Sequence, residues 1–132
     1  MVTQELLNIG IEAKRLAVIE KSLAFHELLN KRFANVNVIL GDAVDLIKLV
    51  GTDQTAISTV FSALPLRSLP PEISKAVGQQ IAQLLPPGGI YIQLTYSWSK
   101  QHPSIPPTLR YKSSRYLWCN LPPARLDVFE RE

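Results

Sequence analysis

Apolar runs typical of β-strands alternate along this chain with segments of helical length, and this order constrains the fold more than any other feature. Four such runs span residues 15–20, 36–40, 56–64 and 90–96. Helical spacing, caps and glycine or proline stops predict helices over residues 3–9, 22–33, 43–50 and 71–85. Because each crossover has the length of a helix, the pattern predicts a parallel α/β sheet covered on both faces.

The last third of the chain departs from this alternation. A proline-rich loop is expected at residues 101–107, and two further strands are expected at residues 116–120 and 125–129. The whole chain has 132 residues, which fits one domain and leaves no room for a second independent core.

Composition narrows the class of protein. No apolar run approaches the roughly 18 residues that span a bilayer, and the first residues lack the pattern of a secretory signal. The single cysteine, Cys119, excludes an internal disulfide and a multi-cysteine metal site, which favours a reducing cytosol. His26 and His102 lack metal-ligand spacing, and no serine-hydrolase elbow or phosphate-binding loop is present. These features predict a cytoplasmic protein without a metal site.

Charge is unevenly distributed along the chain, whose formal net charge is +3. No Asp or Glu occurs between Ile73 and Leu126, where bases and aromatic residues interleave. The bases are Lys75, Lys100, Arg110, Lys112, Arg115 and Arg125, and the aromatic residues are Tyr96, Trp98, Tyr111, Tyr116 and Trp118. Such a surface suits an anionic partner, either lipid headgroups or nucleic acid. The alternative is a solvated rim with the aromatic rings turned into the core.

Polar residues stand where the predicted strands end, which is where ligands bind in parallel α/β sheets. Glu20 ends the first strand and suits the hydroxyls of a ribose, or is an ordinary turn acid. Asp42, followed by Ala43, suits an adenine amino group, or is the N-cap of the next helix. Ser62 and Leu64 precede a proline turn beside the expected ligand crevice, or belong to ordinary turn chemistry.

The order of these segments resembles class I S-adenosylmethionine-dependent methyltransferases. The resemblance lies in Leu16-Ala17-Val18-Ile19-Glu20, Gly41-Asp42-Ala43, Ser62-Ala63-Leu64-Pro65-Leu66 and Pro87-Gly88-Gly89. Within the class it is nearest to soluble bacterial phospholipid N-methyltransferases, which convert phosphatidylethanolamine to phosphatidylcholine. That narrower resemblance lies in Ser62-Ala63-Leu64-Pro65-Leu66, Gln93-Leu94-Thr95-Tyr96 and Trp118-Cys119-Asn120-Leu121-Pro122-Pro123-Ala124. It implies a Rossmann-like, mostly parallel sheet with an antiparallel C-terminal hairpin.

The resemblance also implies roles for particular residues. With S-adenosyl-L-methionine as cofactor, Glu20 would bind the ribose hydroxyls, Asp42 and Ala43 would hold the adenine, and Ser62 with Leu64 would line the methyl-transfer crevice. Tyr96 would receive the methylated ammonium against its ring. The residues expected to contact an anionic lipid surface are Trp98, Arg110, Lys112 and Arg115. The enzyme would then be cytoplasmic and associate peripherally with the inner face of the membrane.

One departure from the family pattern concerns the start of the chain. In the family, a central strand and a Gly-rich loop precede the helix that begins here near Val2 and Thr3. We therefore expect a single, N-terminally incomplete methyltransferase domain whose sheet lacks its first strand. That strand would lie between residues 15–20 and 56–64, so these two strands are expected to lose a shared neighbour.

Two other functions stay open at this point. A methyltransferase acting on ribosomal RNA adenine would share the acid at the first strand end and the Gly-Asp-Ala pattern, and the basic face would suit RNA. Such enzymes typically carry Asn-Leu-Pro-Tyr where this chain has Ser62-Ala63-Leu64-Pro65-Leu66, so the aromatic residue that would stack on the target base is absent and this alternative is disfavoured. The second alternative is a truncated remnant without catalytic activity, serving as a lipid-binding or interaction piece.

Overall fold

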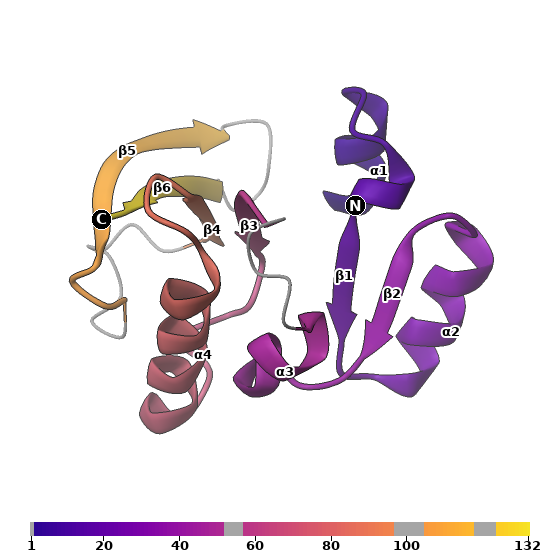
Figure 1. Ribbon diagram of the computed structural model, residues 1–132, viewed down its shortest axis with the longest axis horizontal. Coiled ribbons are helices and arrows are strands. Elements are labelled where there is room, and N and C mark those ends of the chain that lie inside the picture. The colour runs from indigo at the N-terminus through magenta and orange to yellow at the C-terminus, as the bar shows by residue number, and fades with distance from the viewer. Residues whose placement is uncertain (1, 52–56, 97–104, 118–123) are drawn as a thin grey trace.

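The computed structural model of the chain describes residues 2–51, 57–96, 105–117 and 124–132. Helices and strands alternate through most of the chain, and the last two elements, near the C-terminus, are both strands (Figure 1). In chain order the elements are α1 (Val2–Asn8), η1 (Ala13–Arg15), β1 (Ala17–Glu20), α2 (Leu23–Arg32), β2 (Asn37–Leu40), η2 (Ala43–Asp45), α3 (Leu46–Val50), β3 (Thr59–Ser62), α4 (Pro71–Leu84), β4 (Ile90–Thr95), β5 (Leu109–Leu117) and β6 (Ala124–Arg131). The predicted helices and the first four predicted strands are all present.

The strands form two separate sheets. β1 and β2 pair in parallel, from Ala17 opposite Asn37 to Glu20 opposite Leu40. The other four strands have the order β3-β4-β6-β5, in which β3 and β4 are parallel and β6 is antiparallel to both of its neighbours. Within the described residues no pairing joins β1 to β3, as expected for a sheet without the strand between them. The prediction of a Rossmann-like α/β sheet with an antiparallel C-terminal pair is confirmed.

α4 packs against the four-stranded sheet and buries one face of its own. Pro71 occupies its first turn, where a missing backbone N–H costs no hydrogen bond. Val77 and Ile81 are each 2% exposed and share a core cluster with Tyr91 of β4 and Phe129 of β6. Each such side chain contributes on the order of 1.5–3 kcal/mol through its removal from water. This cluster is the main core of the molecule.

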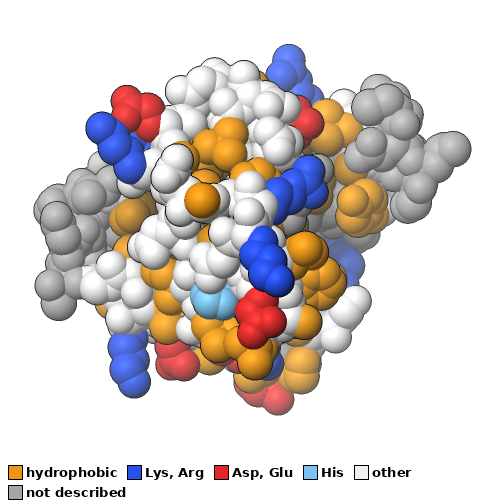
Figure 2. All heavy atoms as spheres, turned by 90° about the vertical axis from the view of Figure 1, so that its right-hand side faces the viewer, with side chains coloured by type: hydrophobic (Ala, Val, Ile, Leu, Met, Phe, Trp, Pro, Cys, Tyr) orange, Lys and Arg blue, Asp and Glu red, His pale blue; other side chains and the backbone are white. Residues whose placement is uncertain are grey.

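α2 covers the two-stranded sheet less completely than its sequence predicts. Ser22 caps it as expected, its side chain accepting a hydrogen bond from the backbone N–H of Phe25. Leu29 and Phe33 are buried, but Phe25 and Leu28 are 58% and 54% exposed. Two strands of four residues each offer only a narrow apolar face, so part of the stripe stays outside. Figure 2 looks onto this side of the molecule, where hydrophobic side chains lie among charged ones.

The position of β5 differs from that of the strand predicted at residues 116–120. It begins at Leu109, well before the predicted strand at residues 116–120, and its ladder to β6 is irregular between Tyr111 and Ser113. β5 is an edge strand with several exposed charged residues, so its apolar alternation is weak in the sequence. Residues 118–120, which were predicted to continue the strand, lie outside the described residues.

Candidate functional site

The first group of predicted site residues meets where β1 and β2 end. Glu20 is the last residue of β1, and its backbone oxygen accepts a hydrogen bond of 2.9 Å from the N–H of Gly41. Asp42 and Ala43 follow directly, at the start of η2. One carboxylate oxygen of Glu20 also accepts the N–H of Ser22 at 3.0 Å. β1 and β2 end side by side (Figure 1), so parallel pairing brings Glu20, Asp42 and Ala43 to the same end of the two-stranded sheet.

Asp42 is held as an anion at this edge. Its Oδ1 accepts the backbone N–H of Val44 at 3.1 Å, and its Oδ2 lies 3.1 Å from the Nζ of Lys21. The Val44 hydrogen bond, followed by the contact with Lys21, lowers the pKa of Asp42 below its ordinary value. Asp42 thus caps η2, as the alternative interpretation expected, and it is ionised at neutral pH. A partly exposed carboxylate can serve both as a cap and as a ligand acceptor.

The second group surrounds a cavity where β3 and β4 end. The cavity has a volume of about 290 Å³ and contains Leu64 and Tyr96 in its wall. Its other walls come from the turn after β3, the end of β4 and the start of β6, and its lining includes Leu66, Arg67, Gln93, Thr95, Arg125 and Asp127. Ser62 is buried and is not among the lining residues, and its Oγ accepts the N–H of Leu64 at 3.2 Å. Tyr96 lies at the rim and is 55% exposed.

A buried amide in the cavity wall joins the end of β4 to the turn after β3. Gln93 is 4% exposed, and its Nε2 donates to the carbonyl oxygens of Leu64 and Leu94 at 2.9 and 2.8 Å. Its Oε1 accepts from the hydroxyl of Tyr91 at 2.5 Å. Burial raises the pKa of Tyr91, so this hydroxyl keeps its proton and remains a donor. The turn that carries Leu64 is therefore fixed to β4 by a side chain whose hydrogen bonds are satisfied.

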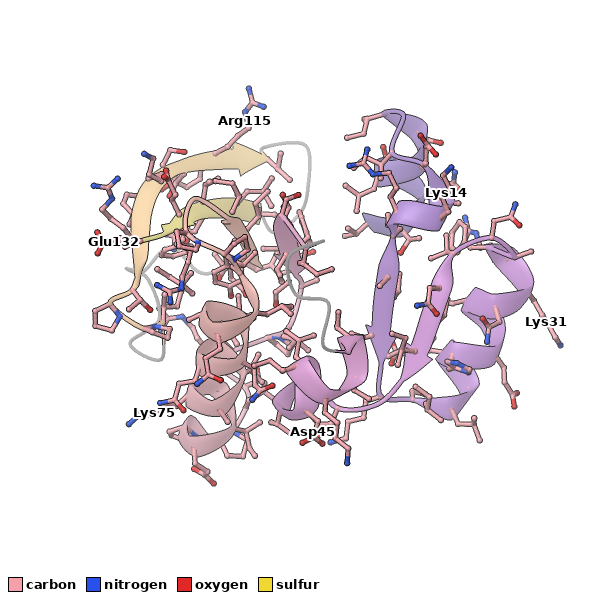
Figure 3. The ribbon with its side chains drawn as sticks, viewed as in Figure 1. Lys14, Lys31, Asp45, Lys75, Arg115 and Glu132 are labelled. Carbon is pink, nitrogen blue, oxygen red and sulfur yellow. The ribbon has the colours of Figure 1, made fainter. Side chains whose placement is uncertain are left out.

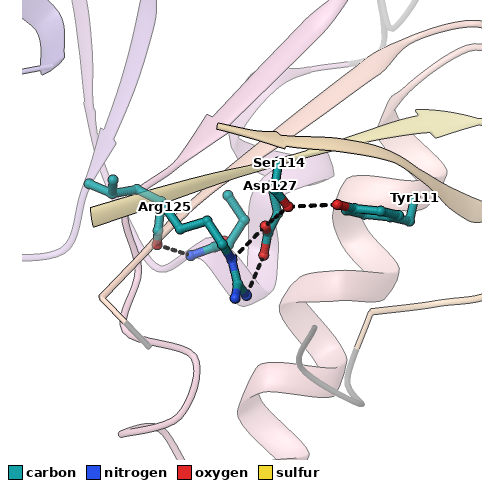
Figure 4. Close-up of polar contacts among 6 residues, drawn as sticks. Tyr111, Ser114, Arg125 and Asp127 are labelled. Atoms are coloured by element: carbon teal, nitrogen blue, oxygen red, sulfur yellow. Dashed lines mark hydrogen bonds and ion pairs between the residues drawn. The ribbon is translucent and has the colours of Figure 1, made fainter. Parts of the chain in front are cut away.

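An ion pair forms the β6 wall of the cavity. Arg125 and Asp127 are 7% and 3% exposed, and two guanidinium nitrogens of Arg125 lie 2.8 and 2.9 Å from the two carboxylate oxygens of Asp127. Asp127 also accepts a hydrogen bond of 2.6 Å from the hydroxyl of Ser114. The Oγ of Ser114 in turn lies 2.7 Å from the hydroxyl oxygen of Tyr111 (Figure 4). Arg125 was expected on a basic surface, but the structure buries it beside an acid.

The predicted lipid-contacting bases lie on β5, with acids of the chain's C-terminal end beside two of them. The Nζ of Lys112 lies 3.0 Å from Glu130, and the Nε of Arg110 lies 3.7 Å from Glu132. Arg115 is exposed and points away from the sheet (Figure 3). Trp98, the fourth predicted residue, lies outside the described residues. The acid-free stretch of sequence is therefore not an acid-free surface, because β6 pairs with β5 and carries acids of its own.

Sequence reasoning missed Arg125, Asp127 and Gln93 as cavity residues. A signal was present, since Gln93 and Thr95, like Arg125 and Asp127, are polar residues two apart in a predicted strand and therefore share one face. No group of three or more potential metal ligands and no helix able to cross a bilayer occurs in the described ranges.

Comparisons with known proteins place this geometry in context. No protein-family model matches the chain. The chain is 34% identical to the ornithine lipid N-methyltransferase of Singulisphaera acidiphila over 87 aligned residues. The alignment covers 61% of this chain and 44% of that protein. The chain thus spans less than half the length of this curated relative.

Solved structures show the same architecture. TrmN from Thermus thermophilus matches with a TM-score of 0.79 at 15% identity, over 99% of this chain and 40% of that protein. The N-methyltransferase NodS from Bradyrhizobium japonicum, in complex with S-adenosyl-L-homocysteine, gives a TM-score of 0.66 at 16% identity, over 89% of this chain and 67% of that protein.

The fold is therefore that of the Rossmann-like class I methyltransferases. Within that class, the chain is similar in sequence to a lipid N-methyltransferase. The resemblance to class I methyltransferases is confirmed for the fold, and the narrower resemblance is supported as far as a similarity to a lipid N-methyltransferase.

Proposed function

We propose that the chain carries the methyl-transfer site of an S-adenosyl-L-methionine-dependent N-methyltransferase that acts on the amino headgroup of a membrane lipid. The observation that carries this proposal is the cavity between the ends of β3 and β4, walled by Leu64 and Tyr96, in a chain with the class I methyltransferase fold. The sequence similarity to an ornithine lipid N-methyltransferase supports a lipid as the substrate.

The residues at the ends of β1 and β2 fit the nucleoside part of the cofactor. Glu20 and Asp42 present two carboxylates at adjacent strand ends, which suits hydroxyl and amino donors. Asp42 is ionised at neutral pH, and the methyl side chain of Ala43 leaves space for a flat ring. In this proposal Glu20 binds the ribose hydroxyls, while Asp42 and Ala43 hold the adenine. When bound, S-adenosyl-L-methionine supplies an electrophilic methyl group on its sulfonium.

The residues around the cavity would bind and orient the amine. Leu64 gives the cavity an apolar wall, which helps to exclude water from the neutral amine. Ser62 and Gln93 hold the backbone on which Leu64 sits. The ring of Tyr96 at the rim would face the ammonium that forms as methyl groups are added. Catalysis would come mainly from positioning, because little else is required of a nucleophile already held in line.

Within this proposal, phosphatidylethanolamine is the substrate that the sequence resemblance favours, and ornithine lipid is the substrate that the curated relative suggests. Either lipid would be reached from a membrane surface, so we propose peripheral association with the inner face, with Arg115 as a contact to anionic lipid. Lys112 and Arg110 would contribute less, since Glu130 and Glu132 lie beside them.

Lipid analysis of cells that make the chain tests the proposal. A host that lacks methylated lipids should accumulate phosphatidylethanolamine or ornithine lipid heavier by one to three methyl groups. Tyr96→Phe should retain this product because it keeps the ring, whereas Tyr96→Ala should reduce it. Methylated ribosomal RNA with unchanged lipids would instead support the RNA alternative, and a folded chain that binds cofactor but methylates neither would refute the lipid proposal.

A further inference from the structure

One face of the four-stranded sheet changes from aromatic to charged toward the cavity. The strand register places Tyr91, Phe129 and Tyr111 in one row across β4, β6 and β5. The rings of this row are packed, with centroids 5.4 Å apart for Tyr91 and Phe129 and 5.9 Å apart for Tyr111 and Phe129. On β4 and β6 the rows that follow are two residues apart and therefore lie on the same side of the sheet. On β5 the irregularity between Tyr111 and Ser113 brings Ser114, three residues after Tyr111, into the next row.

The next two rows are polar. One contains Gln93, Asp127 and Ser114, and the row beyond it contains Thr95, Arg125 and Tyr116. The tyrosine hydroxyls of the aromatic row bond into the first polar row, to Gln93 and Ser114. Arg125 is thus held in place through Asp127, and Asp127 through Ser114, as Figure 4 shows.

This network ends in the cavity, and that requires an explanation. A buried ion pair seldom adds stability over well-packed apolar residues, because both charges lose their hydration. Here both members, Arg125 and Asp127, contribute to the cavity wall, together with Arg67 at the rim. The described charged residues of the wall therefore comprise two guanidinium groups and one carboxylate, and that carboxylate is already shared by Arg125 and Ser114.

We propose that this cavity contains a subsite for the anionic group of a zwitterionic lipid headgroup, in which Arg125 and Arg67 bind the anion. A guanidinium can share its five N–H donors between two oxyanion partners, and it suits both carboxylate and phosphate oxygens. Asp127 is a positioning residue that fixes the plane of Arg125. The inference rests on the proposed function and specifies its substrate: an amine linked by a short carbon chain to a phosphate or a carboxylate.

The shared chemistry is an oxyanion near a primary amine, and it has two sources in lipids. Phosphatidylethanolamine offers a phosphate diester, and ornithine lipid offers a carboxylate. The proposal predicts that both are methylated better than a lipid with a primary amine and no anion. It also predicts which residues create that preference.

The first arm of the test measures methyl transfer to phosphatidylcholine vesicles that contain phosphatidylethanolamine, ornithine lipid or an anion-free alkylamine lipid. Arg67→Gln should raise KM for the two zwitterionic lipids by roughly three- to tenfold, with kcat little changed, and should not raise KM for the alkylamine. Arg125→Lys should raise the same KM values by about tenfold or more, because lysine keeps the charge but loses the planar fork. Arg15→Gln, an exposed arginine of η1 outside the cavity, is the matched control.

The second arm does not require turnover. Nuclear magnetic resonance of isotope-labelled arginine side chains is followed while glycerophosphoethanolamine, N-acetylornithine, inorganic phosphate or ethanolamine is added. The two headgroup analogues should shift the Arg125 and Arg67 signals and leave Arg15 unchanged, while ethanolamine should shift none of them. A response to inorganic phosphate that equals the response to both analogues would show a general anion site and overturn the headgroup assignment.

The two arms separate the possible failures. Shifts of Arg125 and Arg67 without methylation of any lipid would refute the proposed function and retain the anion subsite. Methylation of all three lipids with equal KM, unchanged by Arg67→Gln, would refute the subsite and retain the function. The double variant Arg125→Met/Asp127→Leu removes both charges without leaving one unpaired; a folded double variant that still prefers zwitterionic lipids would also overturn the subsite.

Discussion

Gln93 on β4 donates a hydrogen bond from Nε2 to the carbonyl oxygen of Leu64, 2.9 Å away in the turn that follows β3. The bond joins the end of β4 to the turn after β3, its parallel neighbour, and both residues line the cavity. The same amide accepts from Tyr91, whose ring stacks on Phe129 of the main core. The cavity wall is therefore connected to the core by one buried side chain.

Gln93→Leu should destabilise the fold and impair the site together. Leucine fills a similar volume but removes the hydrogen bonds that Gln93 makes with the buried Tyr91 hydroxyl and with the carbonyl oxygen of Leu64. We expect the free energy of unfolding to fall by about 1–3 kcal/mol in urea titrations. Gln79→Leu, at an exposed position of α4, is the control and should change it by less than about 0.5 kcal/mol. Equal stability of the two variants would contradict the role given to Gln93.

Removing one member of the Arg125–Asp127 pair should lower the free energy of unfolding more than removing both members. Asp127→Leu leaves a buried guanidinium without its carboxylate and is expected to cost about 3–5 kcal/mol of unfolding free energy. Arg125→Met/Asp127→Leu should recover most of that loss. The exposed pair of Lys14 and Glu12 provides the control, and Glu12→Gln should cost at most about 1 kcal/mol. A double variant no more stable than Asp127→Leu would argue against this electrostatic account.

Glu20→Gln should weaken cofactor binding without unfolding the chain. The amide keeps the shape of the side chain, but it offers a neutral acceptor in place of a charged one to the ribose hydroxyls. We expect the affinity for S-adenosyl-L-methionine, measured by calorimetry, to fall by about 10- to 100-fold. Glu27→Gln, on the exposed surface of α2, should leave the affinity unchanged. An unaltered affinity in Glu20→Gln would confine Glu20 to its hydrogen bond with Ser22.

Asp42 should give the chain a recognisable acid dependence. Its pKa is lowered in the folded state by the N–H of Val44 and by Lys21, so its contribution to stability is present above the unfolded pKa of about 3.9. The contribution is lost as pH falls through the lower, folded pKa. Unfolding titrations between pH 7 and pH ~2.5 should show wild type more stable than Asp42→Asn at neutral pH, with the difference vanishing in acid. A constant difference across this range would contradict the assignment.

Much of the fold followed from local patterns in the sequence. Ser22 caps α2 and Pro71 starts α4 as expected, because capping and proline chemistry act over a few neighbouring residues. The strand end at Glu20 was also predicted, because an acid ends that apolar run, whereas β3 ends at Ser62, two residues before the predicted end at Leu64. β5 was placed too late because an edge strand does not need a continuous apolar face.

The walls of the cavity depend on pairing between distant segments, and the sequence alone did not predict them. Asp127 lies beyond the acid-free stretch in sequence, yet antiparallel pairing places it opposite Gln93 and next to Ser114. Pairing of β5 with β6 also puts Glu130 beside Lys112, so the surface of the basic segment carries both positive and negative charges. The roles given to Asp42, Glu20 and Tyr96 remain predictions. The structure fixes their positions and partners, and binding experiments must test their function.

The most direct test of the central claim is methyl transfer from labelled S-adenosyl-L-methionine to vesicles that contain phosphatidylethanolamine or ornithine lipid, with the purified, folded chain as catalyst. The account predicts label in the amine headgroup of at least one of these lipids, and much less with Glu20→Gln. Absence of label in both lipids, from a chain that binds the cofactor in calorimetry, would contradict the account.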